Sequence, residues 1–78
     1  MENEVFKTKD FYLSAFLVAQ GHKILEADRS DPRKVFFAFS DFEGREDLVR
    51  RFLFGQTKVE PQGFITSIKS LKQLIHSG

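Results

Sequence analysis

The sequence predicts an α+β fold, in which a small antiparallel sheet of three strands packs against three helices. Strand-like and helix-like segments alternate along the chain, which is the first observation that favours this class. The segment Lys34–Ser40 alternates strictly with apolar residues on both faces, as a central strand does. Pro61 opens an apolar stripe at helical spacing. The 78 residues suffice for a single compact domain, residues 1–78.

The first strand and the first helix are predicted from adjacent apolar residues and from capping signals. Two neighbouring apolar residues in Glu4–Lys7 indicate a short strand. Residues 10–20 form the first helix, because Thr8 or Asp10 offers an N-cap oxygen and Gly21 stands where a left-handed C-cap is expected. This helix is apolar nearly all round, so it is either buried on most sides or contacts a partner. Because 78 residues enclose a helix with difficulty, we take it as a first indication of an oligomer or a partner.

A β-hairpin is predicted next. Lys23–Asp28 is an extended segment, and Arg29–Arg33 reads as a turn in which Pro32 fixes its own φ. Asp31 can accept a hydrogen bond from the local backbone in this turn. Lys34–Ser40 then returns as the central strand.

Two further helices complete the predicted order. Ser40 and Glu43 fit a capping box for the second helix, which Gly55 closes. Thr57–Val59 is a candidate fourth strand at the sheet edge, which would give a split βαβ, ferredoxin-like plan. We prefer three strands because this segment is so short. The third helix begins at Pro61 and carries an apolar stripe of Phe64, Ile68, Leu71 and Ile75.

Composition excludes several classes of protein. There is no cysteine, so the chain has no disulfide framework and no thiolate metal site, and two histidines are too few for a histidine-based zinc site without carboxylates. Twelve basic against eleven acidic residues give no bulk attraction to nucleic acid or to an anionic membrane. The longest apolar run, Phe11–Ala19, is far shorter than the roughly 20 residues of a membrane span. The segment before it is acidic on balance, unlike a signal peptide, so we expect a cytoplasmic protein.

The ten phenylalanines mark a candidate interaction surface. Aromatic residues on a strand can stack on bases, as in RNA-recognition motifs, but Lys34–Ser40 lacks the glycine and the spacing of that motif. Core packing is the simpler interpretation of most of these rings. If one face stays uncovered, the residues of the predicted interaction surface are Tyr12, Phe16, Phe36, Phe37 and Phe39.

Basic residues supply a second candidate surface. Lys69 and Lys72 lie on the third helix, which has no acidic residue after Glu60, and Lys58 precedes it. Lys58, Lys69 and Lys72 are therefore the predicted nucleic-acid contacts, although a solvated helix face explains them as well. Arg29, Arg33 and Lys34 form another small basic cluster around the hairpin turn.

No catalytic, cofactor or metal site emerges from the sequence. An enzyme would need a pocket that combines His22 with Asp10, and the chain has no nucleophile-elbow or phosphate-loop glycine pattern. The carboxylates around the start of the second helix match helix capping better than metal spacing: Asp41, Glu43, Glu46 and Asp47. We therefore predict no catalytic residue, no cofactor and no enzymatic activity.

Several segments together resemble a family of small bacterial proteins catalogued as a domain of unknown function, number fifty-six fifty-nine. They are Lys7–Leu17, Gly21–Leu25, Arg33–Phe39, Leu48–Phe52 and Leu71–Lys72, within a match over Val5–Leu74. The resemblance implies a compact bacterial α+β domain, and it carries no assigned activity.

The sequence thus predicts a non-enzymatic module that binds a protein partner or a second copy of itself as a homodimer. The alternative is a small accessory protein that binds nucleic acid through the Phe-rich strand and the three lysines.

Overall fold

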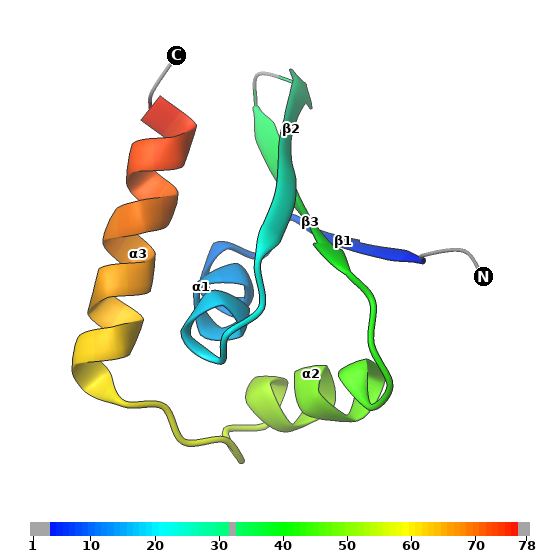
Figure 1. Cartoon of the computed structure of the whole chain (residues 1–78), viewed down its shortest axis with the longest axis vertical. Coiled ribbons are helices and arrows are strands. Elements are labelled where there is room, and N and C mark those ends of the chain that lie inside the picture. The colour runs from blue at the N-terminus through cyan, green and yellow to red at the C-terminus, as the bar shows by residue number, and fades with distance from the viewer. Residues whose placement is uncertain (1–3, 32, 77–78) are drawn as a thin grey trace.

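The computed structural model describes residues 4–31 and 33–76 and confirms the predicted class and element order (Figure 1). The elements are β1 (Val5–Thr8), α1 (Phe11–Ala19), β2 (Ile24–Asp31), β3 (Lys34–Ser40), α2 (Arg45–Leu53) and α3 (Pro61–His76). Within these residues the sheet has three strands, and Thr57–Val59 does not pair with it. The preference for three strands over the ferredoxin-like plan is therefore confirmed.

The three strands form an antiparallel sheet in the order β1-β3-β2, with one face against helices. Phe39 of the central strand lies opposite Phe6 on β1 and Ile24 on β2. Because residues that pair across strands share a face, these three side chains lie on one face of the sheet. Figure 1 shows α1 and α3 on the same side of the sheet, with α2 near one end of it. Phe37 and Phe39 are buried in the core, and Phe36 lies on the other face.

Helix α1 is enclosed by its own chain. Every residue from Leu13 to Leu17 is buried, and the Phe52 ring of α2 stacks on the Phe16 ring at a centroid distance of 4.8 Å. The Ser14 hydroxyl, which is also buried, donates to the Asp10 carbonyl (2.9 Å). The sheet, α3 and α2 thus supply the contacts that we expected from a partner, so α1 is no longer an indication of an oligomer.

Both ends of α1 are fixed by local hydrogen bonds. The Asp10 carboxylate accepts from the backbone N–H of Leu13 (3.0 Å), as the predicted N-cap requires. At the other end the N–H of His22 donates to the Leu17 carbonyl (3.0 Å) and the N–H of Gly21 donates to the Val18 carbonyl (3.0 Å). This pair of bonds is a Schellman motif, with Gly21 at φ +101°. The turn directs the chain straight into β2.

The predicted capping box of α2 is wrong. Ser40 is the last residue of β3 and pairs with Val5 of β1, so the strand ladder holds its backbone extended. The helix begins later, at Arg45, and Gly44 occupies the N-cap position with φ +87° and no side-chain cap. Glu43 is exposed before the helix. The predicted end is confirmed, since Gly55 follows the C-cap with φ +70°.

Asp41 ties the start of α2 to the sheet. Its N–H donates to the Glu4 carbonyl (2.9 Å), and its carboxylate accepts from the Arg45 Nε (2.9 Å) and Nη2 (3.3 Å). The Arg45 guanidinium in turn lies 4.2 Å from the centre of the Phe6 ring, a cation–π geometry. The hydrogen bond from Arg45 lowers the pKa of Asp41 below its ordinary value. These contacts among Asp41, Arg45 and Phe6 join strand β1 to the start of α2.

Strand β2 continues beyond its predicted end. We expected it to stop at Asp28, but pairing resumes at Asp31 opposite Lys34, after a bulge that takes up the extra residue. The predicted turn is therefore shorter than Arg29–Arg33, and its Pro32 lies outside the described residues. Asp31 does accept from the N–H of Arg33 (2.9 Å), as expected. Strand β1 begins and ends one residue later than the predicted Glu4–Lys7.

Helix α3 begins at Pro61 as predicted, and its apolar stripe packs on the core. The Glu60 carboxylate caps its first turn by accepting from the N–H groups of Gly63 (2.6 Å) and Gln62 (3.2 Å). No helix in the described part of the chain is long and apolar enough to cross a membrane.

Gly21→Ala tests the turn after α1. A Cβ atom added at Gly21 would meet no other atom, so the substitution is unfavourable only because an alanine is strained at a positive φ. We expect the free energy of unfolding to fall by about 1–2 kcal/mol, measured by urea denaturation. Gln20→Ala is the control, because Gln20 is exposed and its backbone is right-handed at φ −83°. Its free energy of unfolding should stay near that of the wild type. Equal effects of the two substitutions would contradict the assigned turn.

Asp41→Asn tests the cluster at the start of α2. Because the folded protein lowers the pKa of Asp41, its contribution to stability is full above the unfolded pKa of about 3.9 and is lost as pH falls through the folded pKa. Thermal melts from about pH 6 to about pH 2.5 should show a shallower loss of stability in Asp41→Asn than in wild type. Arg45→Gln should flatten the same profile, since it removes the donor that lowers the pKa. Profiles parallel to wild type would refute this role. Some slope should remain, because Ser30 lowers the pKa of Asp28 in the same direction.

Candidate interaction groove

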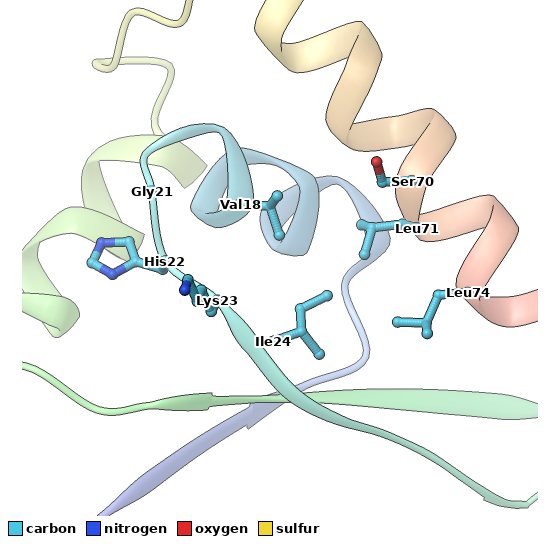
Figure 2. Close-up of a pocket in the computed structure, with 8 residues that line it drawn as sticks. All are labelled: Val18, Gly21, His22, Lys23, Ile24, Ser70, Leu71 and Leu74. Carbon is cyan, nitrogen blue, oxygen red and sulfur yellow. The ribbon is translucent and has the colours of Figure 1, made fainter.

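An apolar groove of about 380 Å³ opens between the end of α1, the beginning of β2 and the second half of α3 (Figure 2). Its volume lies within the range of ligand-binding clefts, roughly 300–1,000 Å³. The residues that line it are Val18, Gly21, His22, Lys23, Ile24, Ser70, Leu71 and Leu74.

Aliphatic side chains from three elements face one another across this groove. Figure 2 shows Val18 of α1, Ile24 of β2 and the two leucines of α3, Leu71 and Leu74, converging on the open space. Leu71 is 1% exposed and belongs to the core cluster, whereas Leu74 is 38% exposed. The floor of the groove is therefore the hydrophobic core itself, and an apolar group that entered would contact the core directly.

Local folding explains why these side chains meet. The Schellman turn at Gly21 sends the chain into β2 within three residues, which places Ile24 opposite Phe39 on the inner face of the sheet. A register shift follows immediately after Ile24. On α3 the spacing of three residues puts Leu71 and Leu74 on neighbouring positions of one helix face.

The polar groups of the groove are few. Lys23 is exposed where it lines the groove, and Ser70 is exposed on α3. The His22 ring points away from the aliphatic side chains and toward α2 (Figure 2). It stacks on Phe42, in the loop before α2, with ring centroids 4.1 Å apart and planes 9° apart. This histidine thus connects the loop after α1 to the loop before α2.

The catalytic combination considered from the sequence is not assembled. Asp10 caps the beginning of α1, whereas His22 follows its end, so a helix of nine residues separates them. At a rise of 1.5 Å per residue that helix is roughly 13 Å long. Residues 4–31 and 33–76 also contain no cluster of three or more potential metal ligands.

Three of the five residues of the predicted interaction surface lie in the core, which corrects that prediction. Phe16, Phe37 and Phe39 are at most 1% exposed, because the sheet and the helices cover them. Tyr12 is 59% exposed, with its ring edge-on to Phe11 at 5.4 Å. Phe36 is half-buried on the outer face of the sheet.

The three predicted nucleic-acid lysines are all exposed, but they do not form one cluster. Lys69 and Lys72 lie three residues apart on α3 and share a helix face. Lys58 precedes the helix, at the opposite end from Lys72, and the helix rise alone puts roughly 17 Å between Pro61 and Lys72.

The sequence predicts which elements the groove residues belong to, but it does not predict that they lie together in space. The one available signal was Leu74, which lies outside the stripe from Phe64 to Ile75 and widens the apolar face of α3 on one side. An apolar residue next to a complete apolar stripe indicates that the apolar face of the helix is too wide for one neighbouring element to cover.

The fold is a small α+β domain with a three-stranded antiparallel sheet, helices on one face and an apolar groove. The chain belongs to the family described as a domain of unknown function (DUF5659), whose model matches residues 3–77. No curated protein and no solved structure matches the chain.

Proposed function

We propose that this domain is a non-enzymatic protein-interaction module that holds an apolar segment of another protein in the groove between α1, β2 and α3. The observation that carries the proposal is a groove of about 380 Å³ whose floor is the core residue Leu71.

The lining of the groove favours an apolar occupant. Burial of apolar surface yields roughly 25 cal/mol per Å², and the aliphatic walls offer such surface on three sides. The side chains come from three separate elements, so an inserted aliphatic group would contact Val18, Ile24 and Leu74 at once. The residues of α1 and α3 that hold these walls are packed into the core, which keeps the site preformed.

The charges around the groove favour an acidic neighbourhood in the partner. Lys23 lines the groove, and none of the residues that line it is acidic. Complementary charge steers association and suppresses wrong partners. The partner segment is therefore an apolar stretch flanked by aspartate or glutamate.

A second copy of the chain fits less well than another protein. Among the described residues, the most exposed large apolar side chains are Phe54 and Leu53, at 71% and 63%. Arg51 lies only two residues before Leu53, so insertion of Leu53 and Phe54 would bring like charges toward Lys23. Such juxtaposition is unfavourable.

Nucleic-acid binding by the Phe-rich strand has less support as the function of this domain. Stacking needs exposed rings, and Phe37 and Phe39 lie under helices. Of that strand's aromatic residues, only the half-buried Phe36 remains on the outer face.

Peptide selection tests the proposal. A library of random 12-residue peptides is selected on the immobilised domain, and enriched peptides are measured by fluorescence anisotropy. We expect aliphatic residues with acidic neighbours, and Leu74→Ser should weaken their binding at least about tenfold. Ile65→Ser is the matched control, because Ile65 is also on α3 and exposed (45%) but does not line the groove. Lys23→Glu should select basic flanks in place of acidic ones.

Three outcomes would overturn the proposal. They are no enrichment over an unselected library, equal loss of binding in Ile65→Ser and Leu74→Ser, and enrichment of sequences that match this chain's own segment 50–55. Circular dichroism of each variant confirms that the fold is intact.

A further inference from the structure

A second pocket, of about 240 Å³, lies between α1, α2 and the connection from α2 to α3. This connection runs at the end of the molecule opposite the hairpin tip (Figure 1). None of the residues of this pocket lines the groove, and its chemistry is different, because most of its side chains are polar. The polar side chains that line it are Gln20, Arg51, Gln56, Thr57 and Lys58.

The way in which α2 ends brings these residues together. The N–H of Gln56 donates to the Arg51 carbonyl (2.7 Å), and the N–H of Gly55 donates to the Phe52 carbonyl (3.1 Å). These two bonds form a Schellman motif, with Gly55 at φ +70°. The chain after Gln56 is thereby brought back beside Arg51, and α1 completes the pocket.

Every polar side chain of the pocket can donate a hydrogen bond, and none is a carboxylate. Arg51 and Lys58 supply a guanidinium and an ammonium, the two glutamines supply amides, and Thr57 supplies a hydroxyl. These donors come from α1, from α2 and from the connection, so they border the pocket on three sides. Such a set of donors suits an anion with several acceptor oxygens.

The guanidinium of Arg51 is only partly engaged within the protein. Its Nε lies 3.1 Å from the Asp47 carboxylate, which does not line the pocket. Among the described residues, no hydrogen bond engages the two terminal nitrogens of Arg51. Asp47 thus holds the side chain in place, and the terminal N–H groups remain for a ligand.

Positive charge remains at the pocket when the nearby carboxylates are counted. Asp47 is shared between Arg51 and Arg50, whose Nη1 lies 4.0 Å away. The next carboxylate along the chain, Glu60, is engaged in the cap of α3. Between them lies Lys58, which forms no ion pair within the described part of the chain. One carboxylate therefore faces three cations in this stretch.

We propose that this pocket binds a terminal phosphate group, either as the free ion or on a small phosphorylated molecule. A phosphate monoester has three strong acceptor oxygens and a charge of about −1.5 to −2 at neutral pH, which matches two cations and donors on three sides. A carboxylate has only two oxygens and would leave donors unpaired.

The size of the pocket agrees with this ligand. Its volume of about 240 Å³ is below the roughly 300–1,000 Å³ of clefts that enclose a whole small molecule. The pocket therefore encloses the phosphate group itself, and the remainder of a phosphorylated molecule would lie outside it.

An amide NMR titration of the intact, isotope-labelled chain with sodium phosphate tests the proposal. At constant ionic strength we expect saturable shifts of the backbone amides of Gln56, Thr57 and Lys58, with a Kd on the order of 1 mM. The amide of Leu74, in the groove, should not shift. Acetate should bind at least about fivefold more weakly than phosphate.

A parallel titration with glycerol 3-phosphate distinguishes the two sources of the phosphate group. Tighter binding than inorganic phosphate assigns the site to a phosphorylated small molecule. Equal or weaker binding assigns it to the free ion. Both results support a phosphate site.

Substitutions test which side chains carry the binding. Lys58→Gln and Arg51→Gln should each raise the Kd for phosphate at least about threefold, since each removes a cation that lines the pocket. Lys69→Gln is the matched control, because Lys69 is also an exposed lysine but lies on α3 outside the pocket. Its Kd should change by less than about 1.5-fold. Leu74→Ser should bind phosphate like wild type, which separates this proposal from that of the groove.

The proposal fails if no saturable shift occurs up to about 20 mM phosphate, or if Lys69→Gln weakens binding as much as Lys58→Gln does. Equal affinity for acetate and phosphate would also overturn it, as would shifts centred on residues outside the pocket. The spectra of the variants without phosphate exclude unfolding as the cause of any loss.

Discussion

The burial of α1 is the constraint on which the rest of this structure depends. A helix without a polar face must be covered on nearly every side, and here one short chain covers it. The sheet supplies Phe37 and Phe39, α3 supplies Leu71, and α2 supplies the ring of Phe52 on Phe16. Each element of the fold therefore has a defined share in enclosing one helix. This accounts for most of the phenylalanine content, since large rings cover a helix with few residues.

The same enclosure leaves one side incompletely covered. Where α1 ends at its Schellman turn, β2 and α3 diverge, and the gap between them is the groove with Leu71 at its floor. The hairpin and α3 meet again farther on, where Arg29 binds the Ile75 carbonyl. The groove is thus a consequence of how β2 and α3 cover α1.

The fold was largely predictable because its signals are local. The N-cap Asp10, the helix start at Pro61 and the alternation of β3 depend on neighbours in the sequence, and the structure has them as expected. The capping box failed because Ser40 obeys a non-local constraint, its pairing with β1. For the same reason the surface could not be predicted: whether a given phenylalanine is covered depends on elements distant in the sequence. The groove lies between β2 and α3, which are far apart in the sequence, so the spacing of residues along the chain does not show that its walls face each other.

The central claim is that one chain suffices to bury α1. Urea denaturation at about 1 µM and about 100 µM protein tests this claim most directly, because the stability of a fold completed by a second copy depends on concentration. We expect the same urea midpoint at both protein concentrations. A midpoint that rises clearly at the higher concentration would contradict it, since it would mean that another copy completes the enclosure of α1.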